Sequence, residues 1–240
     1  MPIAAQQEWC CWLTHYVFKW VIVKPCPWIR ISMPPADESA RLLGRERVCL
    51  LLNHTSFFDS VLLAATLPSG IIWRYKTLMK AALFDIPFFG GICRMVGHFP
   101  VFFQNNDENC FVVDKQQQAK IMDKVRAYVE ANGCLFVFPE GKVNRNPAVL
   151  CPFRRGSFAI VEEMDMAVVT MTTVGNSDTW PRDHQVGGLP ARVTIKLTEV
   201  AKAGHGLTST AIKEKAEAVM QADLTYLLQQ QKNGSNPKET

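Results

Sequence analysis

The sequence of 240 residues lacks several patterns that would assign it to a common class. None of its eight cysteines form Cys-x-x-Cys, and several lie in apolar segments, which favours buried thiols in a reducing compartment over zinc sites or disulfides. No strongly basic run or nucleic-acid motif accompanies the net charge of +4, so the charge indicates a mild preference for anionic lipid surfaces. We therefore expect neither a metal site nor a nucleic-acid partner.

A long apolar run is also missing at the N-terminus. The run from Trp9 to Val23 has about fifteen residues, contains Lys19 and ends before Pro25, whereas a membrane-spanning helix needs roughly 20. The start lacks a basic region, which argues against a cleaved signal peptide. We expect residues 1–27 to form a helix lying in the membrane interface with its tryptophans at headgroup depth. The alternative is a helix packed on the protein's own core.

What the sequence does contain is an alternation of strand and helix patterns. Apolar or alternating runs predict strands at 48–52, 71–75, 133–138, 167–174 and 192–200. Helical patterns occupy 60–67, 114–132 and 208–231. The alternation predicts one α/β domain over residues 28–232, with a largely parallel central sheet flanked by helices. Residues 28–47 are expected to form a connection into it, with a possible short strand at 28–31, and 233–240 a disordered tail.

The most informative stretch runs from Asn53 to Asp59, directly after the first buried strand. His54 and Asp59 can touch only if the histidine lies in the turn and the acid in the first helical turn. A carboxylate on one imidazole nitrogen would leave the other as a general base. The same residues also fit a capping box, Ser56-x-x-Asp59, in which the acid serves only the helix terminus. The two interpretations are compatible.

A second polar group follows another buried strand. Residues 133–138 run directly into Pro139, Glu140 and Gly141, with basic residues close behind. Open α/β sheets bind ligands at this edge, beyond the carboxyl ends of their strands. The alternative is an ordinary turn with a solvated glutamate.

These blocks resemble those of a known family. An Asn-His-x-x-x-x-Asp block followed by Phe-Pro-Glu-Gly is the pattern of the glycerolipid acyltransferases, the lysophosphatidate acyltransferase (PlsC-like) superfamily. Further segments at 76–78, 86–90, 97–101 and 153–157 also look like family segments, so the resemblance covers roughly residues 45 to 200. It implies a membrane-associated O-acyltransferase that moves a fatty acyl group onto the hydroxyl of a lysophospholipid.

The resemblance also implies residue roles. His54 would be the general base and Asp59 its orienter, and backbone amides near residues 56–58 would face the oxyanion. Glu140 and Gly141 would shape the acceptor site, and the phosphate contact would come from nearby basic residues: Lys142, Arg145, Arg154 and Arg155. No bound cofactor is implied. The acyl donor would be acyl-CoA, acyl carrier protein or a phospholipid, and the partner a membrane lipid surface.

Departures from the family pattern concern the substrate. Phe103 stands where a basic residue usually meets phosphate, and the run 166–171 lacks the usual prolines. Lys142-Val143-Asn144 looks like the tafazzin branch, which implies a CoA-independent transacylase as an alternative. A hydrolase using Ser56 or Ser60 is weakened because no Gly-x-Ser-x-Gly elbow occurs. A catalytically silent lipid-binding protein is the third alternative. Endoplasmic reticulum, mitochondrial and bacterial inner membranes are all compatible with the pattern.

Overall fold

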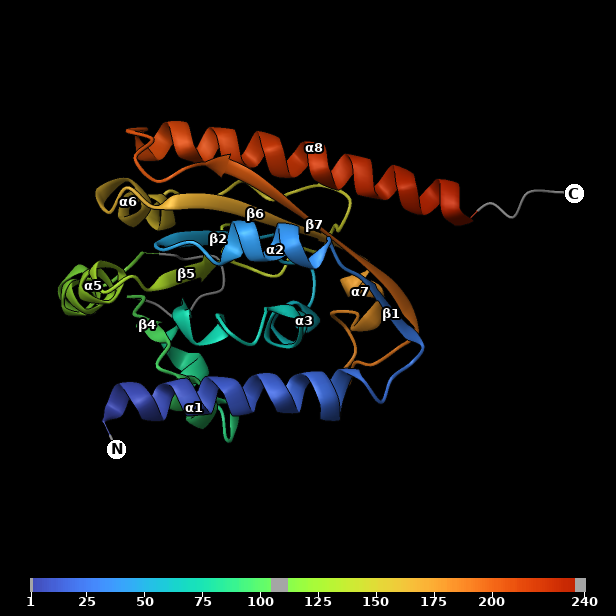
Figure 1. The fold of residues 1–240 in the computed structure, drawn as a ribbon, viewed down its shortest axis with the longest axis horizontal. Coiled ribbons are helices and arrows are strands. Elements are labelled where there is room, and N and C mark those ends of the chain that lie inside the picture. Colours follow the sequence, from blue (N-terminus) through green and yellow to red (C-terminus); the bar gives the residue numbers. More distant parts are fainter. Residues whose placement is uncertain (1, 105–111, 236–240) are drawn as a thin grey trace, which may run out of the picture.

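A computed structural model of the chain describes residues 2–104 and 112–235. Within them one sheet has the strand order β1-β7-β6-β2-β5-β3-β4 (Figure 1). Every neighbouring pair is parallel except β6 and β7, which confirms a largely parallel sheet. The strands are β1 Ile29–Ser32, β2 Val48–Leu52, β3 Tyr75–Lys80, β4 Phe99–Val101, β5 Cys134–Val137, β6 Ala167–Val174 and β7 Ala191–Ala201.

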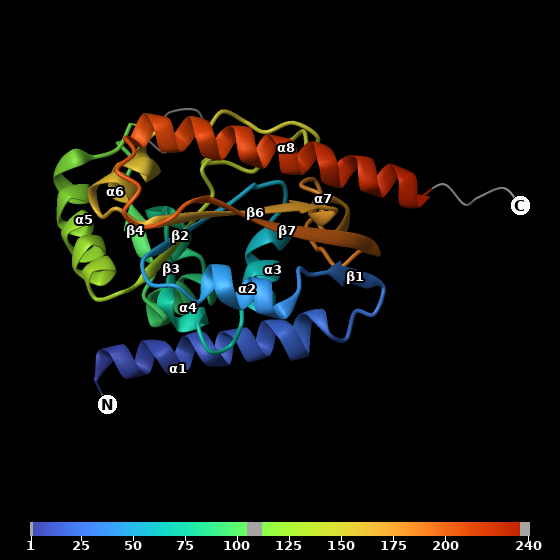
Figure 2. The ribbon, with the colours of Figure 1, turned by 45° about the horizontal axis from the view of Figure 1, so that its top comes forward.

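Helices cover both faces of the sheet, as Figure 2 shows. On one face lie α2 (Ala36–Leu43) and α3 (Phe58–Thr66), and on the other α5 (Lys115–Glu130), α6 (Gly156–Glu163) and α8 (Ser209–Ser235). Successive side chains of a strand point to opposite faces, so β2 contributes to both layers. Its residues Leu50 and Leu52 pack with α2 and α3, whereas Cys49 and Leu51 pack with α5, α6 and α8. The uninterrupted apolar run follows from this two-sided burial.

The order of the strands brings three carboxyl ends together. β2 lies between β5 and β6, and all three run parallel. The segments that follow them carry the polar residues Asn53 to Asp59, Glu140 and, in the short helix α7 (Asn176–Thr179), Asn176. This is the place where open α/β sheets bind ligands.

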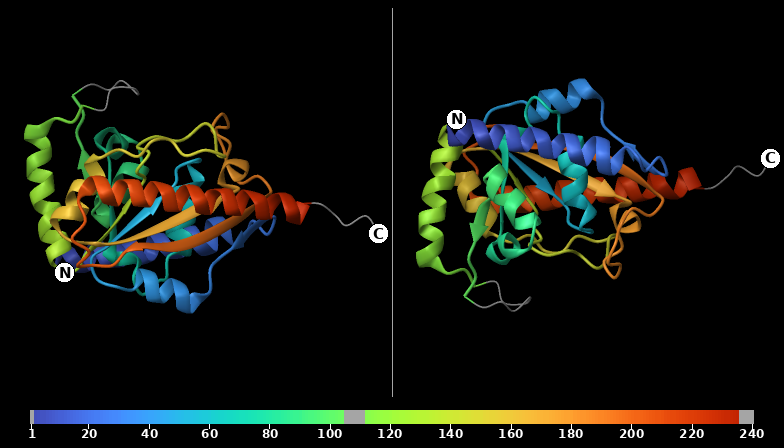
Figure 3. Two further views of the ribbon diagram at one scale, coloured as in Figure 1. Left: turned by 90° about the horizontal axis from the view of Figure 1, so that it is seen from above. Right: turned by 90° about the horizontal axis from the view of Figure 1, so that it is seen from below.

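The N-terminal helix packs along the bottom of the molecule in the view of Figure 1, against α3 and α4 (Phe89–Val96), and lies in front when the molecule is seen from below (Figure 3, right). It consists of α1 (Ile3–Tyr16) and a π-helical continuation, η1 (Val17–Val23). Cys11 and His15 face inward, and His15 Nδ1 lies 2.8 Å from the carbonyl oxygen of Ala64. The aromatic residues Trp9, Trp12, Tyr16 and Trp20 lie on its exposed side. One side of the helix therefore packs on the domain, as the alternative expects, while the other side is exposed and its contact with a membrane stays a prediction.

No helix within residues 2–104 and 112–235 combines the length and the apolar character required to cross a bilayer.

Most predicted elements are confirmed within a few residues, and β6 coincides with the predicted range 167–174. The strand predicted at 71–75 is wrong, because the chain is still turning there. The amides of Ile71 and Ile72 both donate to the carbonyl of Pro68, and residues Ile72–Arg74 form the 3-10 helix η2. The strand β3 begins only at Tyr75.

Three further segments differ from expectation. Residues 28–47 contain the possible short strand, as β1, and in addition the helix α2, which was not predicted. The 3-10 helix η3 (Ala81–Asp85) and the helix α4 lie between β3 and β4, where no helix was predicted. The helix α8 continues to Ser235, into the tail predicted to be disordered, and residues 236–240 lie outside the described residues.

Candidate active site

His54 and Asp59 are in contact. The turn after β2 places His54 Nδ1 2.8 Å from Asp59 Oδ2, and Asp59 occupies the first turn of α3. The same oxygen accepts the backbone amides of Thr55 at 2.8 Å and Ser56 at 3.0 Å. Asp59 therefore caps the N-terminus of the helix and also orients the imidazole. The capping box and the His54–Asp59 contact expected from the sequence are thus one arrangement.

The hydrogen-bond pattern defines the protonation site of His54. Because a carboxylate oxygen only accepts, Nδ1 carries the hydrogen and Nε2 of the neutral ring keeps its lone pair. The ring stacks on Phe138 with 4.1 Å between the ring centroids. The side chain is 16% exposed, and among the described residues no donor reaches Nε2. This nitrogen is therefore available to a substrate hydroxyl.

Asn176, which was not predicted from the sequence, completes the environment of Asp59. Its Nδ2 donates to Asp59 Oδ1 at 2.5 Å and to Thr173 Oγ1 at 3.0 Å. Asn176 is fully buried at the start of α7, directly after Gly175. Gly175 has φ +88°, and a Cβ there would lie 2.1 Å from the carbonyl oxygen of Arg192, so only glycine fits this turn. A polar residue after a third buried strand was the available signal.

Asn53 joins the ends of β2 and β6. Its Nδ2 donates to the carbonyl of Thr173 at 2.8 Å, and its Oδ1 accepts the amide of Thr173 at 2.8 Å. The side chain thereby continues the hydrogen bonding of the two strands beyond Leu52. This link fixes the strand end from which His54 departs.

Glu140 holds the backbone of His54 rather than presenting its carboxylate to solvent. It is 1% exposed, and its Oε1 accepts the amide of His54 at 2.8 Å. Its Oε2 accepts Asn144 Nδ2 and the amide of Cys151, both at 2.8 Å. Burial raises the pKa of Glu140, and these hydrogen bonds oppose the increase. The amide of Asn144 also donates to the carbonyl of His54 at 2.6 Å. The loop after β5 therefore binds both the amide and the carbonyl of His54.

Gly141 and Arg154 brace the same loop. Gly141 has φ +69°, and a Cβ there would lie 2.4 Å from Arg154 Nε. Arg154 Nε donates to the carbonyl of Glu140 at 3.2 Å. Of the other expected phosphate contacts, Lys142 and Arg155 are exposed and do not line the cleft described below. The structure thus gives Arg154 a bracing contact within the chain.

An open cleft of about 410 Å³ adjoins the turn that carries His54. It is lined by Thr55, Asn144, Arg145, Pro147, Ser177, Pro181, Arg182 and Asp183. Arg145 was expected from the sequence, whereas Arg182 was not. Arg182 Nη1 donates to the carbonyl of Val143 at 3.0 Å, which anchors it over the loop after β5.

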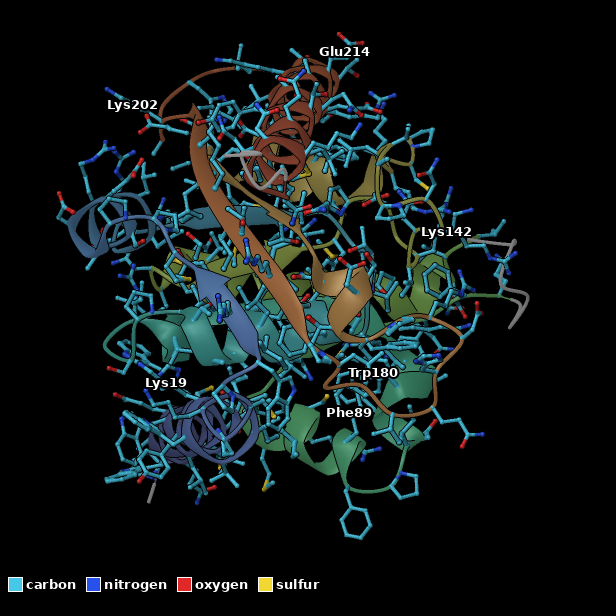
Figure 4. All side chains as sticks on the ribbon, turned by 90° about the vertical axis from the view of Figure 1, so that its right-hand side faces the viewer. Lys19, Phe89, Lys142, Trp180, Lys202 and Glu214 are labelled. Carbon is cyan, nitrogen blue, oxygen red and sulfur yellow. The ribbon has the colours of Figure 1, made fainter. Side chains whose placement is uncertain are left out.

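An aromatic pair borders the same turn. Phe57, which is half exposed, meets Trp180 edge-on at 5.9 Å between ring centroids. Figure 4 looks onto this edge of the sheet, with Lys142 above Trp180 and Phe89 below it. A polar cleft and an aromatic pair therefore both adjoin the turn that holds His54.

The amides expected to face an oxyanion are mostly used within the chain. Those of Thr55 and Ser56 donate to Asp59, and that of Phe58 donates to Ser56 Oγ at 3.1 Å. Ser56 Oγ in turn donates to the carbonyl of Trp180 at 2.7 Å and is buried. Ser56 is therefore not disposed as a nucleophile, and this turn leaves only the amide of Phe57 without an acceptor among the described residues.

Comparison with known proteins identifies the family. A family model described as Acyltransferase matches residues 36–174, which include His54, Asp59 and Glu140. The chain belongs to the acyltransferase family. Asn176, Trp180 and Arg182 lie just beyond the matched range, so the candidate site includes residues outside that range.

Relatives of known name support this assignment. The chain is 26% identical over 130 residues to a 1-acyl-sn-glycerol-3-phosphate acyltransferase of Helicobacter pylori, covering 53% of this chain and 48% of the relative. It is 26% identical over 150 residues to the protein of the same name from Cocos nucifera, covering 62% of this chain and 44% of the relative. Less than half of each relative is thus covered.

The crystal structure of PlsC, the lysophosphatidate acyltransferase of Thermotoga maritima, superposes with a TM-score of 0.67 at 15% identity. That match covers 92% of this chain and 79% of the other, and it shows a common fold.

Proposed function

We propose that this acyltransferase-family chain is a membrane-associated O-acyltransferase that moves a fatty acyl group onto the hydroxyl of a lysophospholipid. The observation that carries the proposal is the contact of His54 Nδ1 with Asp59, which leaves Nε2 open beside a polar cleft and an aromatic surface. A lysophospholipid has a polar headgroup and an apolar chain, and it matches this pair of surfaces.

The reaction follows from the protonation state of His54. Nε2 takes the proton of the acceptor hydroxyl while the hydroxyl oxygen forms a bond to the acyl carbon of the donor. The tetrahedral intermediate collapses, and the bond from the acyl carbon to the donor's sulfur or oxygen breaks. The imidazolium returns the proton to the departing thiolate or alkoxide. Asp59 stabilises the imidazolium and holds the ring in place during both transfers.

Direct transfer, without an acyl-enzyme, is supported by the surroundings of His54. The hydroxyl of Ser56 is buried and donates to a backbone carbonyl, so the turn offers no serine directed at Nε2. The hydrogen bonds of Glu140 and Asn144 to the His54 backbone hold the base in position before the substrate binds. The acceptor hydroxyl is therefore the nucleophile.

The N-terminal helix supports attachment to a membrane surface. Trp9, Trp12, Tyr16 and Trp20 are spaced three or four residues apart and form an exposed aromatic stripe. Their consecutive ring centroids lie 6.0, 5.8 and 6.5 Å apart. Aromatic side chains of this kind favour the headgroup region of a bilayer.

The loop before α4 extends this apolar side. Phe88 is 91% exposed, with Ile86 and Phe89 exposed beside it, and α4 contacts α1 below the sheet. Lys19 and Lys24 lie next to the ring of Trp20, where they would meet anionic headgroups. The buried free thiols of Cys49 and Cys134 suit a domain that faces a reducing compartment.

The donor decides between the two branches of the proposal. The purified protein is incubated with labelled acyl-CoA or labelled phospholipid, together with a lysophospholipid, and the acylated product is measured. Transfer from acyl-CoA gives the conventional enzyme. Transfer only from phospholipid gives the tafazzin-like transacylase suggested by Lys142-Val143-Asn144. Lipid binding without transfer from either donor contradicts the enzymatic proposal and leaves a lipid-binding protein.

The membrane contact has its own test. We expect the double variant Trp12→Ser and Trp20→Ser to sediment with phosphatidylglycerol-containing vesicles about tenfold more weakly than the wild type. The matched control is Trp28→Ser, because Trp28 is exposed to a similar degree but does not belong to the stripe. Equal vesicle binding by the double variant contradicts the membrane contact.

A further inference from the structure

The cleft beside His54 is joined directly to the catalytic turn. Thr55, the residue after His54, lines it, and so does Asn144, whose amide donates to the carbonyl of His54. Its volume of about 410 Å³ falls within the range of small-ligand sites. In a lysophospholipid the glycerol joins the phosphate to the free hydroxyl. A phosphate held in this cleft therefore brings that hydroxyl into the neighbourhood of Nε2.

Two guanidinium groups supply positive charge to the cleft. Arg145 comes from the loop after β5 and Arg182 from the loop after α7. Arg182 donates one N–H to the carbonyl of Val143, and its guanidinium group has further N–H donors for a ligand. Guanidinium groups bind phosphate oxygens with paired hydrogen bonds. The two arginines come from segments far apart in the sequence and converge on one cleft.

A carboxylate accompanies them. Asp183 lines the same cleft directly after Arg182. Within the part of the chain that the structure describes, the side chains of Arg145 and Asp183 form no ion pair and no hydrogen bond. The cleft therefore presents unpaired groups of both signs to a ligand.

We propose that this cleft binds the headgroup of a zwitterionic lysophospholipid, with the phosphodiester on Arg145 and Arg182 and the headgroup cation at Asp183. The inference rests on the proposed function and specifies its acceptor class. A choline or ethanolamine headgroup carries its cation a few bonds from the phosphate, which matches arginines and a carboxylate in one cleft. A phosphomonoester such as lysophosphatidate carries more negative charge and no cation, so Asp183 repels it.

The test compares acceptors that share one acyl chain and differ in the headgroup. Transfer is measured to lysophosphatidylcholine, lysophosphatidylglycerol, lysophosphatidate and monoacylglycerol in mixed micelles of a nonionic detergent, which removes surface-charge effects. We expect the wild type to prefer lysophosphatidylcholine to lysophosphatidate. We expect Asp183→Asn to reduce the ratio of the two kcat/KM values about tenfold, with little change for lysophosphatidylglycerol.

The arginine variants test the phosphate half. Arg145→Gln and Arg182→Gln should each lower kcat/KM about tenfold for the three phospholipid acceptors and leave monoacylglycerol unchanged. The matched controls are Asp178→Asn and Arg155→Gln, which alter exposed charges that do not line the cleft. Both controls should keep the wild-type order of acceptors.

Each outcome has a defined meaning. An unchanged acceptor ratio in Asp183→Asn, or a wild type that prefers lysophosphatidate, overturns the headgroup inference while acyl transfer itself stands. If the wild type acylates no acceptor, the proposed function fails instead. Calorimetric binding of hexylphosphocholine to the wild type and to Asp183→Asn then still tests the cleft. Equal affinity of the two proteins contradicts the inference, and weaker binding by Asp183→Asn supports it.

Discussion

The enclosed and the open halves of the site differ in how their residues are held. Asp59, Glu140 and Asn176 are each at most 2% exposed and bonded to neighbouring groups, so the position of His54 is determined by the fold. Arg145 and Arg182 lie exposed on loops. Under the proposed function, the enclosed half would set the chemistry and the open half would select the acceptor. Substitutions in the enclosed half should therefore lower kcat, whereas those in the open half should change acceptor preference.

The largest effect is expected from Asp59→Asn. An asparagine carries no charge to stabilise the imidazolium, and with its oxygen toward His54 Nδ1 its NH2 group faces the NH2 of Asn176. We expect kcat to fall at least about a hundredfold, measured by acyl transfer at saturating acceptor. Asp85→Asn, at an exposed carboxylate far along the chain, is the control. Activity within a fewfold of wild type would show that Asp59 does not orient the base.

Glu140→Gln should lower both activity and stability. The carboxylate of Glu140 accepts hydrogen bonds from three N–H donors, and the NH2 group of glutamine would face one or more of them without bonding. We therefore expect the free energy of unfolding to fall by about 2 kcal/mol. Urea denaturation measures the loss, and kcat should fall with it.

The pH dependence of that loss has a defined sign. Burial raises the pKa of Glu140 above 4.5, its ordinary value, so its contribution to stability is present below that value and declines as pH rises through the folded pKa. The stability difference between the wild type and Glu140→Gln should thus be wider at about pH 4.5 than at about pH 7.5. A difference that widens toward neutral pH would contradict this account of the carboxyl group.

Asn176→Ala should have an intermediate effect. Asp59 loses one of its donors but keeps the contact to His54 Nδ1, so we expect kcat to fall about tenfold while KM for the acceptor stays constant. A shift in the pH profile of kcat should accompany the loss, which a purely structural role would not produce. A rise in KM at constant kcat would contradict this, because it would show that Asn176 acts on acceptor binding and not on His54.

The smallest effect is expected at exposed basic residues outside the cleft. Lys142→Ala and Arg155→Ala should change kcat/KM less than about twofold for any acceptor, because surface charges contribute little. Steady-state assays with lysophosphatidylcholine and lysophosphatidate check this. A larger loss for Lys142→Ala would extend the acceptor site beyond the cleft lining.

The buried strands and the dyad could be predicted because their signals are local. An apolar run marks β2, and the spacing of His54 and Asp59 limits how they can meet. The partners of these residues could not be predicted, because they depend on strand register. Asn176 reaches Asp59 across 117 residues of sequence, and Glu140 reaches the His54 amide across 86.

The role of each partner was also hidden in the sequence. Glu140 was expected at the acceptor site because a carboxylate after a strand commonly faces ligands, but three donors enclose it. Of the amides of residues 56–58 expected at an oxyanion, those of Ser56 and Phe58 donate to Asp59 and Ser56, since capping and oxyanion binding require the same groups. Asn144, which marks the tafazzin resemblance, bonds to Glu140 and to the His54 backbone. Its contacts in the loop therefore concern the positioning of His54.

The most direct test of the account compares the wild type with His54→Ala in a single turnover of labelled donor with excess lysophospholipid. His54 is the proposed base, so we expect acyl transfer at least about a thousandfold slower in the variant, with donor and acceptor binding retained. Circular dichroism and urea denaturation establish that the variant is folded. Transfer by folded His54→Ala at the wild-type rate would contradict the central claim that this histidine deprotonates the acceptor.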